Sequence, residues 1–288
     1  IHYLSKLGLD AIFYPCMTYN LDEGLGDNHY NCPIVATYPE VIRNNVDNLR
    51  AEGVRFMSPF LPYDDKRRLA ERLAEELRDF GVTAAEVRMA CAKAVAEEDS
   101  FKEDIRRQGK LLVNQLSREG KKGIVLAGRP YHVDPEINHG IPELIVSYNL
   151  AVFTEDSIPE NLPSEHPLRV TDQWVYHSRL YRAAEFVRTR DDLELVQLNS
   201  FGCGLDAITA DQVSEILEGS GKLYTLIKID EVNSLGAARI RIRSLLAAME
   251  QRRRRRRERQ IVPAAYHRTE FTKKMFDEGY TILARKMS

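Results

Sequence analysis

The stretch GIVLAGRPYH, residues 123–132, decides the fold of this chain. Its first half is an apolar run of the length of one buried β-strand, and Gly128 and Pro130 end that run. Arg129 and His132 follow at the predicted carboxyl end of the strand. Open parallel sheets bind ligands outside the carboxyl ends of their strands. This stretch therefore predicts a buried parallel strand that leads into a binding loop.

The same alternation of strands and helices recurs on both sides of this stretch. Short apolar runs predict further strands at residues 9–14, 53–58, 150–153, 193–198 and 224–230. Helical patterns lie between or after them, at residues 38–52, 140–148, 174–189, 210–218 and 237–257. This order predicts an α/β fold with two Rossmann-like or flavodoxin-like open parallel-sheet units.

A purely helical segment separates these two units. Asp64 is suited to cap one helix, and Thr83 with Glu86 forms a capping box for a second helix that runs to about Leu116. We expect four parts: a partial α/β unit at 1–63, a helical insertion at 64–120, a second α/β unit at 121–260, and a linker with the start of a further unit at 261–288.

Composition narrows the class of protein. The chain has 288 residues, of which 43% are hydrophobic, and a formal net charge of -2. Such a chain can bury a sizeable core, and its charge argues against general nucleic-acid binding. No apolar run reaches the roughly 18 residues of a membrane span, and no secretory leader is seen. We expect a cytoplasmic protein. Because the chain begins with Ile1, we also expect it to be a piece of a longer one.

The four cysteines do not suggest a disulfide framework in a chain this long. Cys91 lies on the apolar face of the predicted helix 83–116, so we expect it to be a core residue. Cys16, Cys32 and Cys203 instead lie in loops beside prolines or glycines, where cysteines are typical metal ligands. No CxxC pair is present, and unligated loop thiols are the alternative.

Two further patterns favour other sites. Residues 202–207 match G-x-G-x-x-[GA], which with Asp230 predicts a dinucleotide site that uses Gly202 and Gly204. The loop from His132 to His139 has a spacing able to hold a metal, although hydrogen bonding to a substrate is the simpler interpretation.

Two nucleotide or nucleic-acid signals are weak or missing. No P-loop motif precedes any Gly-Lys pair. The arginine run at residues 252–257 lacks the interleaved aromatic residues that single-strand binding needs, and it is typical of a solvated helix end.

Seven segments of the chain together resemble one known family. They are FYPC at 13–16, HYNCPIV at 29–35, YPEVI at 38–42, AGRPYH at 127–132, INHGIP at 137–142, LNSFGCGLDA at 198–207 and KIDE at 228–231. They run over nearly the whole chain and are similar to the activase-related branch of the 2-hydroxyacyl-CoA dehydratase superfamily, that is, to the CoA-substrate-specific enzyme activases.

The resemblance implies an oxygen-sensitive [4Fe-4S] cluster held on three cysteines, or a double-cubane variant of it. Cys16 and Cys203 match the loop cysteines best suited to ligation, and Cys32 is the third choice. A cysteine upstream of this chain is the alternative to Cys32. With such a cluster present, Arg129, His132 and His139 are candidates to bind or protonate the substrate, an assignment that rests on their position in the loops.

The implied activity is ATP-coupled transfer of a low-potential electron to a CoA thioester or another small molecule. The electron would come from an ATP-hydrolysing activase domain, upstream in the same polypeptide. The chain would then be part of a dehydratase or reductase, with no nucleic acid or membrane as partner, and a homodimer is left open. Two alternatives remain: a dinucleotide-binding Rossmann domain, and a non-catalytic scaffold that docks an activase.

Overall fold

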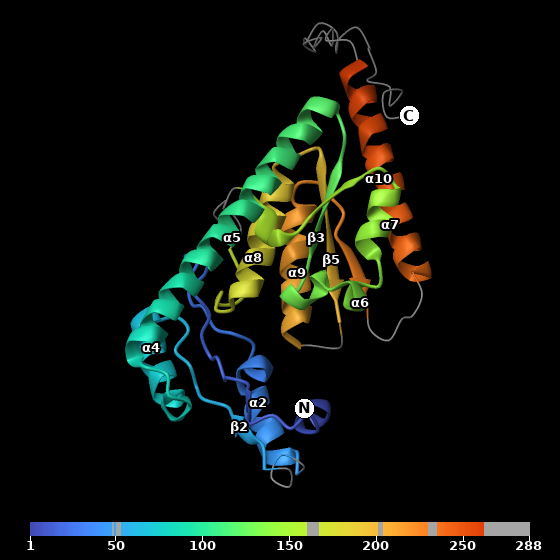
Figure 1. Ribbon diagram of the computed structural model, residues 1–288. Helices are drawn as coiled ribbons and strands as arrows, with labels where there is room; N and C mark the ends of the chain where they lie inside the picture. Colours follow the sequence, from blue (N-terminus) through green and yellow to red (C-terminus); the bar gives the residue numbers. More distant parts are fainter. Residues whose placement is uncertain (48, 50–52, 160–166, 201–203, 230–234, 262–288) are drawn as a thin grey trace, which may run out of the picture. The chain divides into compact units, whose positions relative to one another are not determined.

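The computed structural model describes residues 1–47, 49, 53–159, 167–200, 204–229 and 235–261 (Figure 1). The chain forms two compact units, Ile1–Leu245 and Leu246–Ser288. The strands and the candidate site all belong to the first unit. Among the described residues, no helix combines the length and apolar character needed to cross a membrane.

The N-terminal part contains a small parallel sheet of two strands. Helix α1 (His2–Ser5) precedes β1 (Ala11–Phe13), and β1 pairs in parallel with β2 (Arg55–Met57). Between the strands lies α2 (Pro33–Asn45). The expected start of this helix, near residue 38, is wrong. Pro33 begins the helix because proline lacks only an N–H that the first turn leaves unpaired, and the helix then continues through Pro39.

The predicted helical segment is confirmed in the middle of the chain. It consists of α4 (Lys66–Glu76), the 3₁₀ helix η1 (Arg78–Phe80) and α5 (Ala84–Glu119). The expected capping box at the start of α5 is present, with both of its hydrogen bonds. The cap of α4 is Asp65 rather than Asp64, because the Asp65 carboxylate accepts two backbone N–H groups of the first turn.

The main sheet has four parallel strands. They are β3 (Gly123–Ala127), β4 (Ala151–Phe153), β5 (Leu193–Asn199) and β6 (Thr225–Lys228), in the spatial order β4-β3-β5-β6. Counted along the chain from β3, this order is 2-1-3-4, which is the flavodoxin-like arrangement. The predicted α/β class with parallel sheets is confirmed.

The segments between and after these strands are mainly helical. They are η2 (Pro130–Val133), α6 (Pro135–Asn138), α7 (Ile141–Ser147), η3 (Glu155–Ser157), α8 (Val175–Arg188), α9 (Gly204–Glu218) and α10 (Gly236–Ile261). In Figure 1, α7 lies on the other side of the sheet from α8 and α9. The described part of α9 begins at Gly204, well before the expected residue 210.

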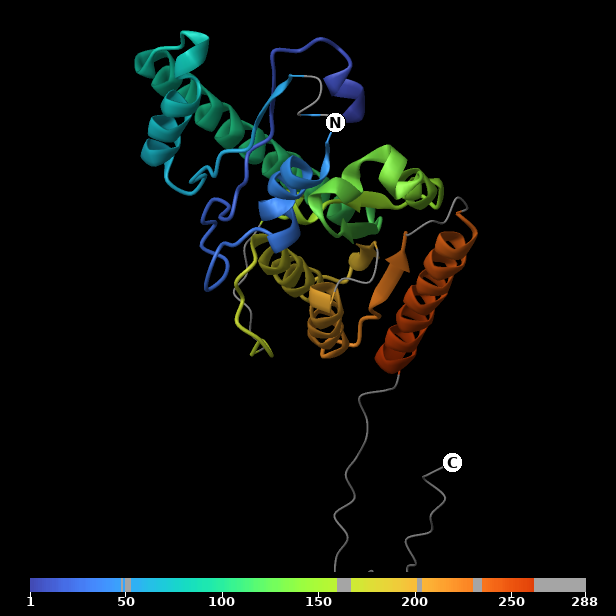
Figure 2. The same ribbon diagram turned by 90° about the horizontal axis from the view of Figure 1, so that it is seen from below.

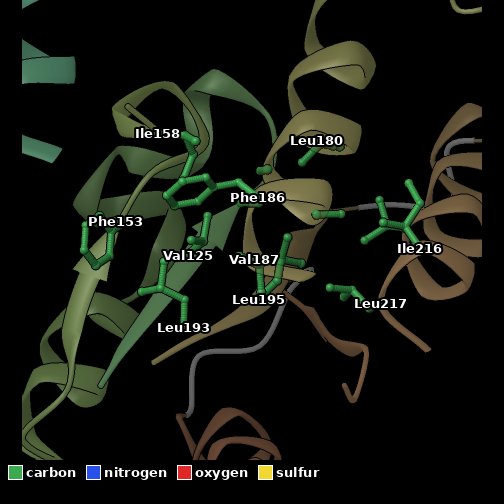
Figure 3. Packing of buried hydrophobic residues seen from close by; sticks show 14 of the residues in the cluster. Val125, Phe153, Ile158, Leu180, Phe186, Val187, Leu193, Leu195, Ile216 and Leu217 are labelled. Atoms are coloured by element: carbon green, nitrogen blue, oxygen red, sulfur yellow. The ribbon is translucent and has the colours of Figure 1, made fainter. Parts of the chain in front are cut away.

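The core lies between the main sheet and helices α5, α8 and α9 (Figures 1 and 3). Val125, Leu193 and Leu195 of the central strands have no exposed surface, and they face Phe186 and Val187 of α8. Figure 2 shows the molecule from below. The apolar side chains of the central strands are thus closely packed between the sheet and these helices.

Candidate functional site

The strand order creates a crevice at one edge of the main sheet. β3 is flanked by β4 on one side and β5 on the other, so the connections that leave β3 and β5 run in opposite directions. The loop that begins with Gly128 and Arg129 follows β3, and Ser200 follows β5. The predicted binding loop therefore lies at the topological switch point, the usual ligand position in such sheets.

A buried ion pair joins the two sides of this crevice. The Arg129 guanidinium donates to the Asp206 carboxylate in the first turn of α9, and the side chains are only 10% and 6% exposed. Nε2 of His177 lies 3.7 Å from the same carboxylate. Burial by itself raises the pKa of Asp206, but His177 and Arg129 outweigh it and hold that pKa below its ordinary value.

His132 folds back beneath the same loop. The Arg129 backbone N–H donates to His132 Nδ1 over 2.9 Å, and Nε2 lies 3.1 Å from Ser200 Oγ. Burial and the Arg129 charge lower the pKa of His132 to about 4, with Asp206 acting in the opposite sense. Only glycine fits at position 128, since a Cβ there would lie 2.3 Å from His132 Nδ1.

This geometry argues against a serine nucleophile at Ser200. Because Nδ1 of neutral His132 accepts a backbone hydrogen bond, its proton is on Nε2, which donates to Ser200. A general base would have to accept from the serine instead. Ser200 also bonds the Tyr131 hydroxyl at 2.9 Å, so the three side chains hold the two loops together.

A cavity of about 1030 Å³ opens beside this crevice. Cys32 and Met17 line it from the N-terminal part of the chain, Phe101 from α5, and Arg129 and Tyr131 from the loop after β3. Its wall is mainly apolar, with charged side chains of both signs among the lining residues. The cavity is large enough for a ligand of cofactor size.

Ion pairs fasten the walls of the cavity to one another. Glu23, in the loop between the two predicted cysteine ligands, accepts from Arg179 of α8 at 2.8 Å. The Glu23 carboxylate also lies 3.8 Å from Nζ of Lys102 on α5. Glu98 of α5 accepts from the Tyr63 hydroxyl at 2.7 Å. The cysteine-bearing loop, α5 and α8 therefore form one continuous lining.

The two described candidate cysteines have different surroundings. Cys16 has no exposed surface, and burial raises the pKa of its thiol, partly offset by the backbone N–H of Glu40. Cys32 is half-buried, caps the N-terminus of α2 and lines the cavity. Glu40 lies eight positions beyond Cys32 on α2, which corresponds to about 12 Å of helix, so the two thiols contact different parts of that helix.

Thiol labelling should separate these two cysteines. We expect a variant that keeps only Cys32 to react with a maleimide reagent in the native apoprotein. A variant that keeps only Cys16 should react about 100-fold more slowly, because its thiol becomes accessible only on local opening. Both should react at equal rates in denaturant. Equal rates in the native state would contradict the enclosed position of Cys16.

The other predicted site residues are placed as follows. His139 is exposed, with φ 53°, at the end of α6, and it does not line the cavity with Arg129. Gly204 is the first residue of α9, and a Cβ there would meet nothing within 4 Å. Gly202 and Cys203 lie outside the described residues. Over the part of the chain that is described, no three His, Cys, Asp or Glu side chains lie close enough together to hold a metal ion.

A comparison with protein families identifies the N-terminal part of the chain. The family described as "CoA enzyme activase uncharacterised domain" matches residues 1–158, more than half of the chain. The chain belongs to this family. The matched residues run from α1 through β4 and η3, so they include Cys16, Cys32 and the loop after β3. No curated protein and no solved structure matches. The family resemblance seen in the sequence is thereby confirmed.

Two further side chains at this site are not identified by the sequence patterns: Glu155 within the CoA enzyme activase domain, and Asp206 beyond it. Asp206 occupies a variable position of the glycine-rich pattern at 202–207, which gives it no role. Glu155 follows the strand at 150–153 and lines the cavity. Both lie just beyond the carboxyl end of a strand, and that position is the signal that could have identified them.

Proposed function

We propose that this chain binds a [4Fe-4S] cluster beside the cavity, and that it serves ATP-coupled low-potential electron transfer to a CoA thioester or another small molecule held there. The observation that carries the proposal is that Cys32 and Arg129, from distant parts of the chain, line the same cavity. Membership of the CoA enzyme activase family supports it. A bound cluster would supply single electrons at low potential.

Cys32 fits a ligand role because the N-terminus of α2 stabilises negative charge, as a thiolate requires. Cys203 remains a proposed ligand. Its described neighbours Ser200 and Asp206 bond Tyr131 and Arg129, which line the cavity. Cys16 fits less well, because its thiol has no exposed surface. The third ligand is then Cys16 after a local rearrangement, or a cysteine upstream of this chain.

The cavity suits a ligand with an apolar arm and an anionic group. Phe101 and Ile105 of α5 give it an apolar wall, and Arg106 follows at the next position. Arg106 is exposed and has no ion-pair partner among the described residues, so it is free to meet a phosphate. An acyl thioester of CoA combines both chemical features. We propose that an activase domain upstream in the same polypeptide supplies the electron.

The dinucleotide alternative meets an electrostatic obstacle. A pyrophosphate would use the positive N-terminal end of α9. The buried Asp206 carboxylate already occupies the first turn of that helix, where it is paired with Arg129. The scaffold alternative leaves the cavity without a role. We therefore prefer the cluster and thioester proposal to both.

Iron and acid-labile sulfide content after anaerobic purification tests the proposal. We expect about four irons per chain in the wild type. Cys32→Ser and Cys203→Ser should each lose most of this iron, and Cys91→Ser is the matched control because its half-buried thiol lies on α5 and does not line the cavity. Cys16→Ser shows whether the enclosed thiol is the third ligand. Absence of iron after reconstitution, in a longer polypeptide that restores the upstream cysteine as well, would refute the cluster.

A further inference from the structure

Glu155 is a carboxyl group of the cavity to which the preceding roles assign nothing. It begins η3, directly after the residue that follows β4, and it lines the cavity together with Arg129 and Tyr131. It is half-buried. The end of β4 is next to the end of β3, because the two strands are paired in parallel. Glu155 therefore lies at the ligand-binding edge of the sheet.

The cations that face Glu155 from the loop after β3 and from α8 are already engaged. Arg129 is paired with Asp206, and Arg179 with Glu23. Arg182 donates to the Leu25 carbonyl. Tyr176 is the remaining titratable group that α8 contributes to the lining.

The lining groups of α5 and of η3 itself do not neutralise Glu155 either. Lys102 is paired with Glu98, and Arg106 and Glu97 are exposed. Asp156, the next residue of η3, is exposed and adds negative charge. Among the described residues, Glu155 has no ion-pair partner, which disfavours its ionised form.

The pKa of Glu155 agrees with the absence of an ion-pair partner among the described residues. Burial raises the pKa of its carboxyl to about 7. The backbone N–H groups of Glu155 itself and of Gly128, together with the Arg179 charge, offset only part of the increase, and Asp156 adds to it. A carboxylic acid that keeps its proton near neutral pH can donate a hydrogen bond, which a carboxylate cannot do.

We propose that Glu155 binds the carbonyl oxygen of an acyl thioester as a neutral acid, through its O–H group. This inference rests on the proposed function, since it takes an acyl-CoA as the ligand of the cavity. The carboxyl donates one hydrogen bond and no covalent bond changes. Binding of the carbonyl stabilises the protonated form of Glu155, so the complex takes up a proton from solution whenever the free carboxyl is ionised.

Calorimetric titration with acetyl-CoA at pH 7.5, in two buffers of different ionisation enthalpy, measures this proton uptake. We expect the wild type to take up roughly half a proton or more per bound acetyl-CoA. Glu155→Gln should still bind acetyl-CoA, with an uptake near zero. Glu97→Gln, which alters an exposed carboxylate of the same cavity, is the matched control and should behave like the wild type. Coenzyme A, which lacks the carbonyl, should give a smaller uptake in the wild type.

Equal proton uptake in the wild type and Glu155→Gln would overturn the inference, as would binding to the wild type without uptake. Absence of any acetyl-CoA binding would count against the proposed function instead. In that case, thermal unfolding of the wild type and Glu155→Gln between pH 5 and 8 tests whether Glu155 keeps its proton near neutral pH. Its folded-state pKa of about 7 lies above the ordinary 4.5. The wild type should therefore lose stability relative to Glu155→Gln as the pH rises through this range, and parallel curves would overturn the inference.

Discussion

Replacement of Asp206 by alanine is expected to lower the free energy of unfolding by about 3–5 kcal/mol. The change removes the partner of a buried cation, since the Arg129 side chain is only 10% exposed. A buried charge without a counterion is far more costly than the pair was favourable. Urea unfolding followed by circular dichroism would measure the loss.

A matched control and a double substitution test whether the loss of stability comes from the unpaired Arg129 charge. Asp211→Ala alters an exposed carboxylate on the same helix and should change the free energy of unfolding by less than about 0.5 kcal/mol. In Asp206→Leu combined with Arg129→Met, no buried charge is left unpaired, so we expect part of the stability to return. A loss in Asp206→Ala no larger than that in Asp211→Ala would contradict the buried ion pair.

The lowered pKa of Asp206 also predicts how the stability of the protein depends on pH in the acidic range. The pKa of Asp206 is lower in the folded protein than its ordinary value. The stability that the carboxylate contributes is therefore present at neutral pH, and it is lost as the pH falls through the acidic range. The difference in the free energy of unfolding between the wild type and Asp206→Ala should therefore become smaller as the pH falls through that range.

Replacement of Gly109 by alanine is expected to destabilise the fold by about 3 kcal/mol. Gly109 is buried in the middle of α5, and a Cβ there would lie 1.8 Å from the carbonyl oxygen of Ser157. That oxygen belongs to the backbone of η3, so no side-chain rotation relieves the clash. Helix α5 and η3 would have to separate, and Glu155 would move with η3.

The sign of this effect is itself the test. In an open helix the same substitution stabilises by roughly 1 kcal/mol, because alanine is the better helix former. Lys110→Ala, at the adjacent exposed position, is the control and should be nearly neutral. A Gly109→Ala variant as stable as the wild type would mean that α5 does not approach η3 this closely. Thermal or urea unfolding of the wild type, Gly109→Ala and Lys110→Ala would measure these differences in stability.

The local features of the fold could be predicted from the sequence because their causes are local. The capping box of Thr83 and Glu86 satisfies the first turn of α5 without help from the rest of the chain. The apolar run from Gly123 to Ala127 becomes β3 because a fully buried parallel strand needs apolar side chains on both faces. The predicted start of α2 near residue 38 is wrong, because the helix begins at Pro33 and continues through Pro39.

The composition of the candidate site could be predicted only in part. The position of Arg129 at the end of β3 followed from the pattern of the chain, and so did the loop position of Cys32. The enclosed environment of Cys16 did not, since burial depends on segments remote in sequence, here α2. The partnership of Arg129 with Asp206 was missed for the same reason.

The sequence by itself determined the α/β class, the helical segment in the middle of the chain, the family, and which loops follow strands. The tertiary structure decided which of these loops meet. The order β4-β3-β5-β6 brings the loop of Arg129 beside Asp206, and the packing of the cysteine-bearing loop against α5 and α8 opens Cys32 and Glu155 to one cavity. Periodicity and capping act within a few residues, whereas strand order and burial are properties of the whole packed chain.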